Sequence, residues 1–328
     1  MSAAKKAASQ PAEPLSFAHF GRLATLPQDA LDADVVHFHW AGGGLFDFKS
    51  IARNWPQKLP LVWTLHDLNP VMACGHYLQE RNVQWSRALE DRWFNLFGRR
   101  IVTSSLRAKR ALFGAAEVHL VGTSEWLCQC AQETEIGRCA SSISKIAYPL
   151  QWPELEGFNK SALREELDLP IDRPVVCFGA ADVGNPRKGF QYVERLMQNP
   201  RFKELHWAVF GAGQLPQTAL RIKHFGRVYD AFDLNKIYAA SDLLIMPSEE
   251  EAFGQVAAEA LACGTPVICF SNTGTCDLVI HSQTGLVVDP TTPEALDNAV
   301  KKLLSDRMAP LSSASVQGAF REFWMENM

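Results

Sequence analysis

Short apolar runs alternate with longer amphipathic stretches along the second half of the chain. The apolar runs predict strands at 174–180, 205–213, 221–228, 243–248, 266–270 and 285–288. Helical spacing predicts helices at 187–199, 232–242, in the Ala-rich stretch after 248 and at 292–306. The last of these has Thr292 as N-cap and Pro293 at its first position. Strands alternating with helices in this way predict a parallel sheet with crossover connections.

The first half shows the same alternation, less regularly. Strands are expected at 33–40, 59–67 and 117–122, and helices at 86–97 and 124–135, with a further strand and a Pro-rich linker at 143–157. Two such runs predict an α/β protein with two doubly wound, Rossmann-like parallel-sheet domains, at 15–150 and 151–310. The polar, low-complexity residues 1–14 are expected to form a disordered leader, and 311–328 a C-terminal helix.

Composition restricts the function classes. The 328 residues are 47% hydrophobic and 21% charged, as in ordinary soluble proteins, and no apolar run approaches the roughly 20 residues that span a bilayer. The net charge of −4 gives no electrostatic reason to expect nucleic acid as a partner. Eight scattered cysteines, several inside apolar runs, indicate reduced thiols in a cytoplasmic enzyme. Metal binding by Cys128, Cys130 and Cys139 is the alternative, although they lack paired C-x2-C spacing.

Ligands of doubly wound sheets bind beyond the carboxyl ends of the strands, which directs attention to the loops there. The loop "MPSEEEAFG" carries three successive carboxylates before the Ala-rich helix, and that helix carries one more, Glu259. One interpretation is structural, because Ser248 and Glu251 have the spacing of a capping box. The other is a ligand site. Gly254 at the helix entrance permits close approach of a ligand, and Glu259 borders an apolar face where it needs a polar partner.

The segment "SEEEAFGQVAAEALACGTPVICF" resembles the signature of family 4 retaining glycosyltransferases of the GT-B fold. That signature has two glutamates separated by seven residues, and Glu251 and Glu259 have this spacing with Phe-Gly between them. The flanking "IYAASDLLIMPS" and "TGTCDLVIHSQTGLVVDPTTPEAL" fit the family in order, so the resemblance covers about residues 175–305. It implies the GT-B fold and an enzyme that transfers sugar from a nucleotide-sugar donor with anomeric retention.

The resemblance also implies residue roles that are chemically coherent. Glu251 would accept hydrogen bonds from hydroxyls of the donor sugar, and Glu259 from the nucleotide ribose, because a carboxylate offers two acceptor oxygens to a diol. Backbone amides near Phe253 and Gly254 would hold the diphosphate. Lys188, in "NPRKGF", matches the family's phosphate lysine and would stabilise the departing diphosphate. Glu249 and Glu250 receive no role and are expected to be solvated.

Other donor-side positions are less typical of the family. Many relatives carry an arginine several residues before the lysine, where this chain reads "GAADVGNP", so Arg187 is the expected substitute. Gly211 and Gly213 in "FGAGQ" resemble the loop that passes near the nucleobase, with a plain tight turn as the alternative. Val228 is expected to line the base pocket through its backbone. Because lysine and amides supply positive charge, no metal and no cofactor beyond the UDP- or GDP-linked donor are expected.

The first half resembles a subset of the family that builds bacterial surface polysaccharides. In "VWTLHDLNPVMACGHY", His66 matches the family histidine near the reacting sugar, and Asp67 is a candidate to orient it. His37 and His39 alternate onto one strand face, where a structural role is preferred to metal binding because no third ligand is evident. The glycines at 41–44 indicate a flexible loop or one that something approaches closely.

Relatives usually begin with a strand, a Gly-rich turn and a helix before the "HFHW" strand, so the first domain is expected to be incomplete at its N-terminal side. The prediction is therefore a cytoplasmic, retaining, metal-independent glycosyltransferase of polysaccharide biosynthesis, using a glycan or lipid-linked acceptor, with peripheral association at the inner face of the membrane left open. The alternative is a catalytically impaired relative that binds nucleotide or a partner glycosyltransferase. A different nucleotide-sugar enzyme, such as an epimerase, would not explain the Phe-Gly between the spaced glutamates.

Overall fold

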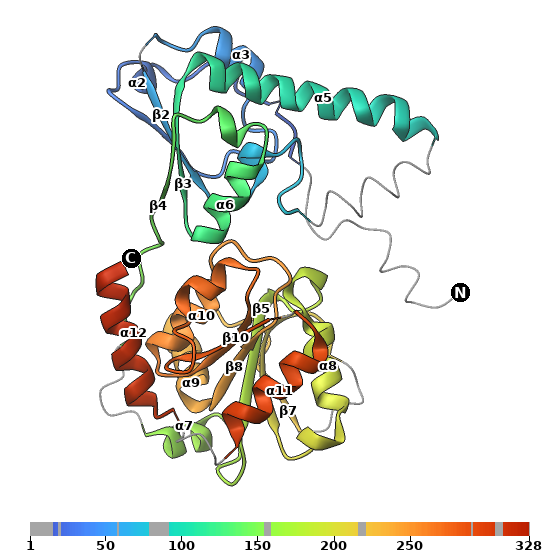
Figure 1. Ribbon diagram of the computed structural model, residues 1–328, viewed down its shortest axis with the longest axis vertical. Coiled ribbons are helices and arrows are strands. Elements are labelled where there is room, and N and C mark those ends of the chain that lie inside the picture. Colours follow the sequence, from blue (N-terminus) through green and yellow to red (C-terminus); the bar gives the residue numbers. More distant parts are fainter. Residues whose placement is uncertain are drawn as a thin grey trace. The chain divides into compact units, whose positions relative to one another are not determined.

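The computed structural model divides into two compact units, with the boundary between Ala147 and Tyr148 (Figure 1). It describes residues 16–18, 21–57, 59–78, 92–153, 159–215, 221–289, 291–305 and 311–327. The expected leader at 1–14 lies outside these residues.

The N-terminal unit is built on a sheet of four parallel strands in the order β1-β2-β3-β4. The strands are β1 (Val36–Phe38), β2 (Pro60–Leu65), β3 (Glu117–Gly122) and β4 (Ser142–Lys145). Its helices are α2 (Gln28–Leu31), α3 (Phe48–Arg53), α5 (Arg92–Ala115) and α6 (Glu125–Glu133), with 3-10 turns η1 (Asn69–Val71) and η2 (Gly137–Cys139). The indole of Trp63 on β2 is fully buried and contacts the rings of Phe38, Phe48 and Phe113, so aromatic packing joins the sheet to α3 and α5.

The C-terminal unit has six parallel strands in the order β10-β9-β8-β5-β6-β7. They are β5 (Val175–Asp182), β6 (His206–Ala212), β7 (Ile222–His224), β8 (Leu243–Met246), β9 (Val267–Phe270) and β10 (Gly285–Val288). The chain runs outward from β5 to β7 and then returns to β8 on the other side of β5. This is the doubly wound Rossmann order, and its topological switch point lies between β5 and β8.

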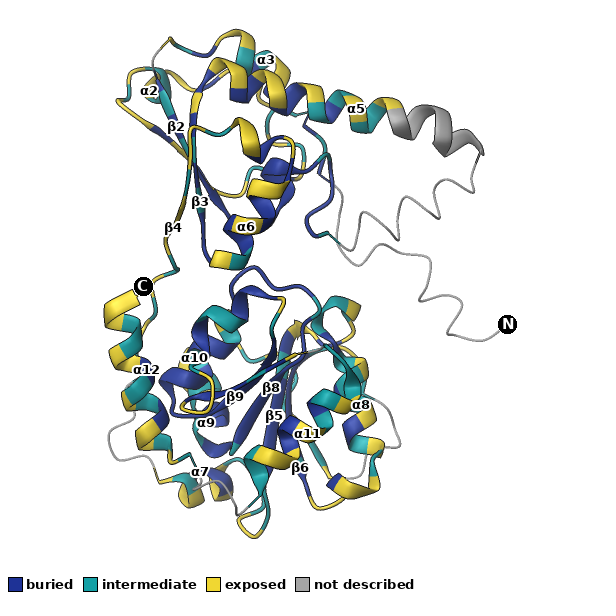
Figure 2. Ribbon diagram, in the orientation of Figure 1, coloured by how far each residue is buried: buried dark blue, intermediate teal, exposed yellow. Residues whose placement is uncertain are grey.

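Helices cover both faces of this sheet. They are α7 (Lys160–Glu166), α8 (Phe190–Gln198), α9 (Ala231–Ala240), α10 (Gln255–Ala262), α11 (Pro293–Leu304) and α12 (Ser313–Asn327), with 3-10 turns η3 (Pro186–Lys188), η4 (Pro200–Phe202) and η5 (Gly274–Leu278). Residues of α8 and α11 share one apolar cluster with the central strands. The strands β8 and β9 are buried throughout, whereas the edge strand β7 is not, and the helices are exposed on their outer sides (Figure 2). Runs of apolar residues in the central strands therefore follow from burial on both faces.

Most of the expected elements are present, with three corrections of extent. The expected strands at 33–40 and 221–228 cover only Val36–Phe38 and Ile222–His224. The expected helix at 86–97 lies partly outside the described residues, and α5 continues to Ala115, well beyond it. Side-chain oxygens of Ser124 and Thr292 cap α6 and α11 as expected. Among the residues described, no helix is long and apolar enough to cross a membrane.

Candidate functional site

Two loops meet at the switch point of the C-terminal sheet. The first follows β5 and contains η3, and the second follows β8. Gly189 closes the first loop with a left-handed φ of 73°, and a Cβ there would lie 1.9 Å from the carbonyl oxygen of Pro247. The amide of Glu249 donates to the carbonyl of Arg187 at 2.9 Å, so the loops are bonded backbone to backbone.

This junction brings two cations and a carboxylate together. The ammonium of Lys188 lies 2.5 Å from Glu251 Oε2, and Arg187 Nη1 lies 4.0 Å from the same oxygen. Arg187 Nη1 also donates to the carbonyl of Glu250 at 2.9 Å. The side chains of Arg187 and Glu251 are only 12% and 11% exposed, so these charges interact where water screens them weakly. The structure thus places together three of the residues expected at the donor site.

The structural interpretation of the acidic run is wrong. Ser248 Oγ lies 3.5 Å from Glu251 Oε2, but α10 begins only at Gln255, so the two residues do not form a capping box at its start. The expectation that Glu250 is solvated is also wrong, because Glu250 is buried. Glu249 is partly exposed, and its Oε1 accepts hydrogen bonds from the side chains of Gln191 and Tyr192 on α8.

Helix α10 begins directly after this loop without a side-chain cap. Its N-cap is Gly254, with a left-handed φ of 98°, and a Cβ there would lie 2.5 Å from Thr275 Oγ1. The amide of Gly274 donates to the carbonyl of Glu251 at 2.7 Å, so the turn at η5 supports the same loop. The first amides of a helix have no acceptor in a preceding turn and carry partial positive charge, which suits an anion.

Glu259 lies one turn into α10 and is half-buried. Its Oε2 accepts a hydrogen bond of 3.0 Å from the hydroxyl of Tyr238, which is fully buried on α9. Burial raises the pKa of the Glu259 carboxyl, and hydrogen bonds from Tyr238 and Gln255 oppose this rise. One carboxylate oxygen is therefore oriented by the protein. Sequence reasoning missed Tyr238; the apolar spacing of its helix indicated only that the position was buried.

Phe253 is almost fully buried, so only its backbone is available for the expected contact with the diphosphate. Its ring contacts Tyr148 edge-on, with centroids 5.1 Å apart, and lies 6.4 Å from that of Trp324 on α12. The ring of Phe320, also on α12 and fully buried, lies 5.5 Å from that of Trp324. Helix α12 thus packs behind the loop that precedes α10.

The expected base-side positions lie around the end of β6. Gly211 and Gly213 have φ of 117° and 115°, and a Cβ at Gly211 would lie 1.8 Å from the carbonyl oxygen of Ala180. The amide of Gly211 donates to the carbonyl of Gly226 at 2.7 Å, which joins β6 to the loop after β7. Val228 lies farther along this loop and is half-buried. Gly211 ends β6 together with Ala212, and Gly213 follows directly, so these backbones lie at the carboxyl edge of the sheet.

In the N-terminal unit, His66 follows β2 and pairs with another histidine. Its Nε2 lies 3.2 Å from Nδ1 of His39. Partial burial and the nearby His39 lower the pKa of His66, so its imidazole is neutral at pH 7. Asp67 does not serve as the expected orienting partner. Its Oδ2 lies 2.6 Å from His76 Nδ1, and its Oδ1 accepts the amide of Asn69 at 2.7 Å.

The other candidate ligands for a metal do not form a site. His37 Nε2 bonds Thr64 Oγ1 at 2.8 Å. Cys128 and Cys130 are buried, whereas Cys139 is exposed. Across the described parts of the chain, no group of three or more His, Cys, Asp or Glu side chains is arranged to hold a metal.

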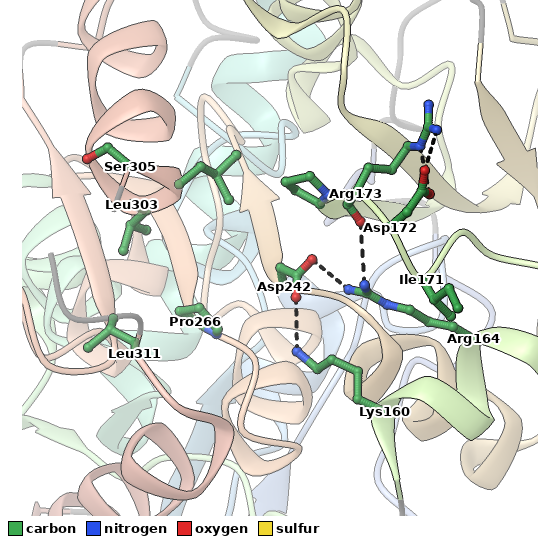
Figure 3. Close-up of a pocket in the computed structure, with 12 residues that line it drawn as sticks. Lys160, Arg164, Ile171, Asp172, Arg173, Asp242, Pro266, Leu303, Ser305 and Leu311 are labelled. Atoms are coloured by element: carbon green, nitrogen blue, oxygen red, sulfur yellow. Dashed lines mark hydrogen bonds and ion pairs between the residues drawn. The ribbon is translucent and has the colours of Figure 1, made fainter. Parts of the chain in front are cut away.

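A cavity of about 410 Å³ lies at the opposite, amino edge of the C-terminal sheet (Figure 3). Its charged residues pair with one another: Asp242 bonds Arg164 at 2.5 Å and Lys160 at 3.2 Å, and Arg173 bonds Asp172 at 2.7 Å. Asp242 also accepts the amide of Val175 at 2.8 Å. This network fastens α7 to the start of β5, and we assign it a structural role.

Comparison with known proteins agrees with this geometry. Residues 164–319, which lie within the C-terminal unit, match the family described as glycosyl transferases group 1. The chain is 30% identical over 184 residues to D-inositol 3-phosphate glycosyltransferase of Xylanimonas cellulosilytica, covering 51% of this chain and 43% of that one. It is 30% identical over 171 residues to an uncharacterized glycosyltransferase of Methanocaldococcus jannaschii, covering 48% and 41%. The chain thus spans about two-fifths of the length of these curated relatives.

Solved structures extend the likeness across both units. Anabaena HepE in complex with UDP-glucose matches with a TM-score of 0.60 at 19% identity, covering 90% of this chain and 76% of that one. Sucrose-phosphate synthase from Thermosynechococcus elongatus matches with a TM-score of 0.60 at 20% identity, covering 90% and 71%. At these identities the likeness concerns fold, and it establishes two parallel-sheet α/β domains of the GT-B kind.

Proposed function

We propose that this protein transfers a sugar from a nucleoside-diphosphate donor to a glycan or lipid-linked acceptor. The observation that carries the proposal is the meeting of Lys188, Arg187 and Glu251 beside the glycine-capped start of α10. Cations, helix amides and an oriented carboxylate at a switch point suit a ligand that carries both a diphosphate and sugar hydroxyls.

Each group has a role in this proposal. The ammonium of Lys188 and the first amides of α10 stabilise the diphosphate as the glycosidic bond breaks. Arg187 provides further positive charge and holds the acidic loop in place. Glu251 accepts hydrogen bonds from the donor sugar, and Glu259, oriented by Tyr238, accepts them from the ribose.

The remaining details follow from the resemblance. Backbone at Gly211, Gly213 and Val228 lies beside the base, and His66 acts on the reacting sugar. UDP is the preferred donor nucleotide, with GDP as the alternative, because Anabaena HepE was solved with UDP and with UDP-glucose. The positive charge comes from the protein, so no metal is required, and the anomeric configuration is retained.

A role in surface-polysaccharide synthesis is part of the proposal and rests on "TLHDLNPVMACGHY" in the N-terminal unit. A lipid-linked acceptor would bring the protein to the inner face of the membrane as a peripheral protein. All eight cysteines are free, and six are buried, which suits a cytoplasmic location.

The test is a thermal-shift screen with UDP, GDP and ADP and their sugars, followed by detection of released nucleotide in the presence of EDTA. We expect stabilisation by one nucleotide series and turnover that EDTA does not change. His66→Ala should lower turnover while leaving nucleotide binding intact. Absence of any shift would overturn the proposal, and binding without turnover across acceptors would favour a catalytically impaired relative.

A further inference from the structure

Trp40 is a large aromatic residue at an exposed position in the N-terminal unit. It lies two residues beyond the end of β1, at the carboxyl edge of the sheet, and 54% of it is exposed. A single exposed apolar side chain needs no explanation by itself. The close packing of the protein backbone against this indole, however, does need an explanation.

Two glycines pack closely against the indole and support it. A Cβ at Gly42 would lie 2.9 Å from Trp40 Cζ2, and one at Gly43 would lie 3.1 Å from Trp40 Cη2. Gly43 and Gly44 have φ of 66° and 73°, in the left-handed region. The glycine run after β1 therefore lets the ring approach the backbone of its own loop, where any larger residue would displace it.

A buried chain of hydrogen bonds holds this loop in place. The amide of Gly43 donates to Ser16 Oγ at 3.0 Å, and Ser16 Oγ lies 3.0 Å from His76 Nε2. His76 Nδ1 lies 2.6 Å from Asp67 Oδ2. Ser16, His76 and Asp67 are all less than 10% exposed. Burying three polar side chains is costly unless each is bonded, and here they form a network that holds one glycine amide.

The order serine, histidine, aspartate is also that of a hydrolytic triad, but the surroundings do not suit that chemistry. Ser16 Oγ already accepts the Gly43 amide, and the small cavity beside Gly42 and Asp67 has a volume of about 10 Å³. Such a cavity holds about one water molecule and no substrate. The network therefore acts on the loop, and through the loop on Trp40.

Polar groups lie beside the supported indole. His39 and His66 line the same small cavity as Trp40 and bond each other at 3.2 Å. The indole N–H of Trp63 donates to the carbonyl of His39 at 2.9 Å and fixes the end of β1. A rigid apolar ring next to hydrogen-bonding imidazoles matches a pyranose, which has an apolar C–H face and a rim of hydroxyls.

We propose that Trp40 stacks against a pyranose ring of the acceptor glycan, with His39 bonding its hydroxyls. The inference rests on the proposed glycosyl transfer, whose acceptor it places at the end of β1. It makes Trp40 a specificity-determining residue, and it makes Ser16, His76 and Asp67 positioning residues that act through the glycine loop.

The first test is binding to a glycan array by the full chain, without any donor, followed by titration of the glycans retained. Trp40→Ala should reduce affinity about tenfold or more, and Trp40→Phe should retain part of it. Val35→Ala is the matched control, because Val35 is 48% exposed in the same unit. Retention of no glycan by the unmodified protein, or equal affinities for it and Trp40→Ala, would overturn the proposal.

The second test leaves Trp40 in place and changes a glycine that packs against its indole. Gly42→Ala puts a methyl group against the indole and against Ser16 Oγ, only 2.7 Å away, and should weaken glycan binding as strongly as Trp40→Ala. Gly114→Ala is the control, because a Cβ there meets nothing within 4 Å. If Gly42→Ala retains its fold by circular dichroism and its glycan affinity is unchanged, the proposal that Gly42 supports the indole is wrong.

These outcomes are separable from those of the proposed function. Nucleotide binding by the C-terminal unit should be the same in Trp40→Ala, Gly42→Ala and the unmodified protein. If nucleotide binds and glycan does not, the stacking proposal fails and the donor site stands. If glycan binds through Trp40 and no nucleotide binds, the transferase proposal fails and the protein is a saccharide-binding module.

Discussion

Lys188 and Glu251 form an ion pair of 2.5 Å across the switch point of the C-terminal sheet, and each comes from the loop after a different strand. Both side chains are largely removed from water, at 22% and 11% exposure. The pair places the cation proposed to bind phosphate directly beside the carboxylate proposed to accept sugar hydroxyls.

Lys188→Ala should lower kcat for transfer about 100-fold, roughly 2.7 kcal/mol, because one charge on the departing diphosphate is lost. Steady-state kinetics with the donor found in the nucleotide screen measure this. Lys223→Ala, which removes an exposed partner of Asp168 elsewhere on the unit, should leave kcat unchanged. Equal activity of the two variants would show that Lys188 has only a structural role.

Glu259→Gln should weaken nucleotide binding while the fold stays intact. A charge-assisted hydrogen bond contributes about 1.5–3 kcal/mol, so the dissociation constant for the nucleotide should rise roughly 10- to 100-fold. Isothermal titration calorimetry gives the constant, and Tyr238→Phe, which keeps the carboxylate but removes its donor, should have a smaller effect. An unchanged constant for Glu259→Gln would refute the ribose assignment.

The same carboxyl predicts a pH dependence of stability without ligand. Burial raises the pKa of Glu259 above 4.5 in the folded state, so the unfolded chain loses this proton first as pH rises. The folded state therefore binds more protons within that window, and its stability falls as pH rises from 4.5 through the raised pKa. Urea titrations over this range should show a smaller fall for Glu259→Gln. Parallel curves for the two proteins would argue against the raised pKa.

Gly254→Ala should disrupt the entrance of α10. The left-handed φ of 98° costs an alanine about 1–2 kcal/mol, and the added Cβ would also meet Thr275 Oγ1. We expect nucleotide affinity to fall tenfold or more by calorimetry, since a shift of this turn moves the amides. Gly318→Ala on α12 meets nothing within 4 Å and serves as the control. Affinity loss in both variants alike would mean that the turn is not the cause.

Phe320→Ala should destabilise the C-terminal unit by about 3–5 kcal/mol, because it leaves a cavity where a fully buried ring was packed. The free energy of unfolding from urea titration measures this. Met325→Ala on the same helix is 76% exposed and should change it by less than about 0.5 kcal/mol. A small effect at Phe320 would mean that α12 packs only loosely behind the site.

The fold was largely predictable because burial on both faces makes parallel strands continuous apolar runs. Segments such as "VVCF" and "LLIM" indicate strands from composition alone. Thr292 indicates the start of α11 because threonine is a common N-cap residue. The length of α5 was not predicted, because short polar and charged runs such as Arg99–Arg100 and Thr103–Ser105 interrupt the apolar residues beyond position 97.

The site residues were predictable where the family motif fixes their spacing. Their hydrogen-bond partners were not predictable, because several partners are possible for one side chain. Ser248 and Glu251 fit a capping box, yet the left-handed Gly254 delays the helix until Gln255. Asp67 is adjacent to His66 in sequence, but neighbouring residues after a strand point to different sides, and Asp67 bonds His76 instead. The partnership of Ser16 with His76 spans 60 residues, and no local pattern reports such a separation.

The glycine at position 189 has a consequence for binding thermodynamics. It lets the backbones of the two switch-point loops touch, and the bond from the Glu249 amide to the Arg187 carbonyl ties them together. Lys188 and Glu251, which lie on these two loops, are therefore held in place relative to each other. A donor would bind to a site that is already ordered in the folded protein. Its association should accordingly carry only a small conformational-entropy penalty from this part of the chain.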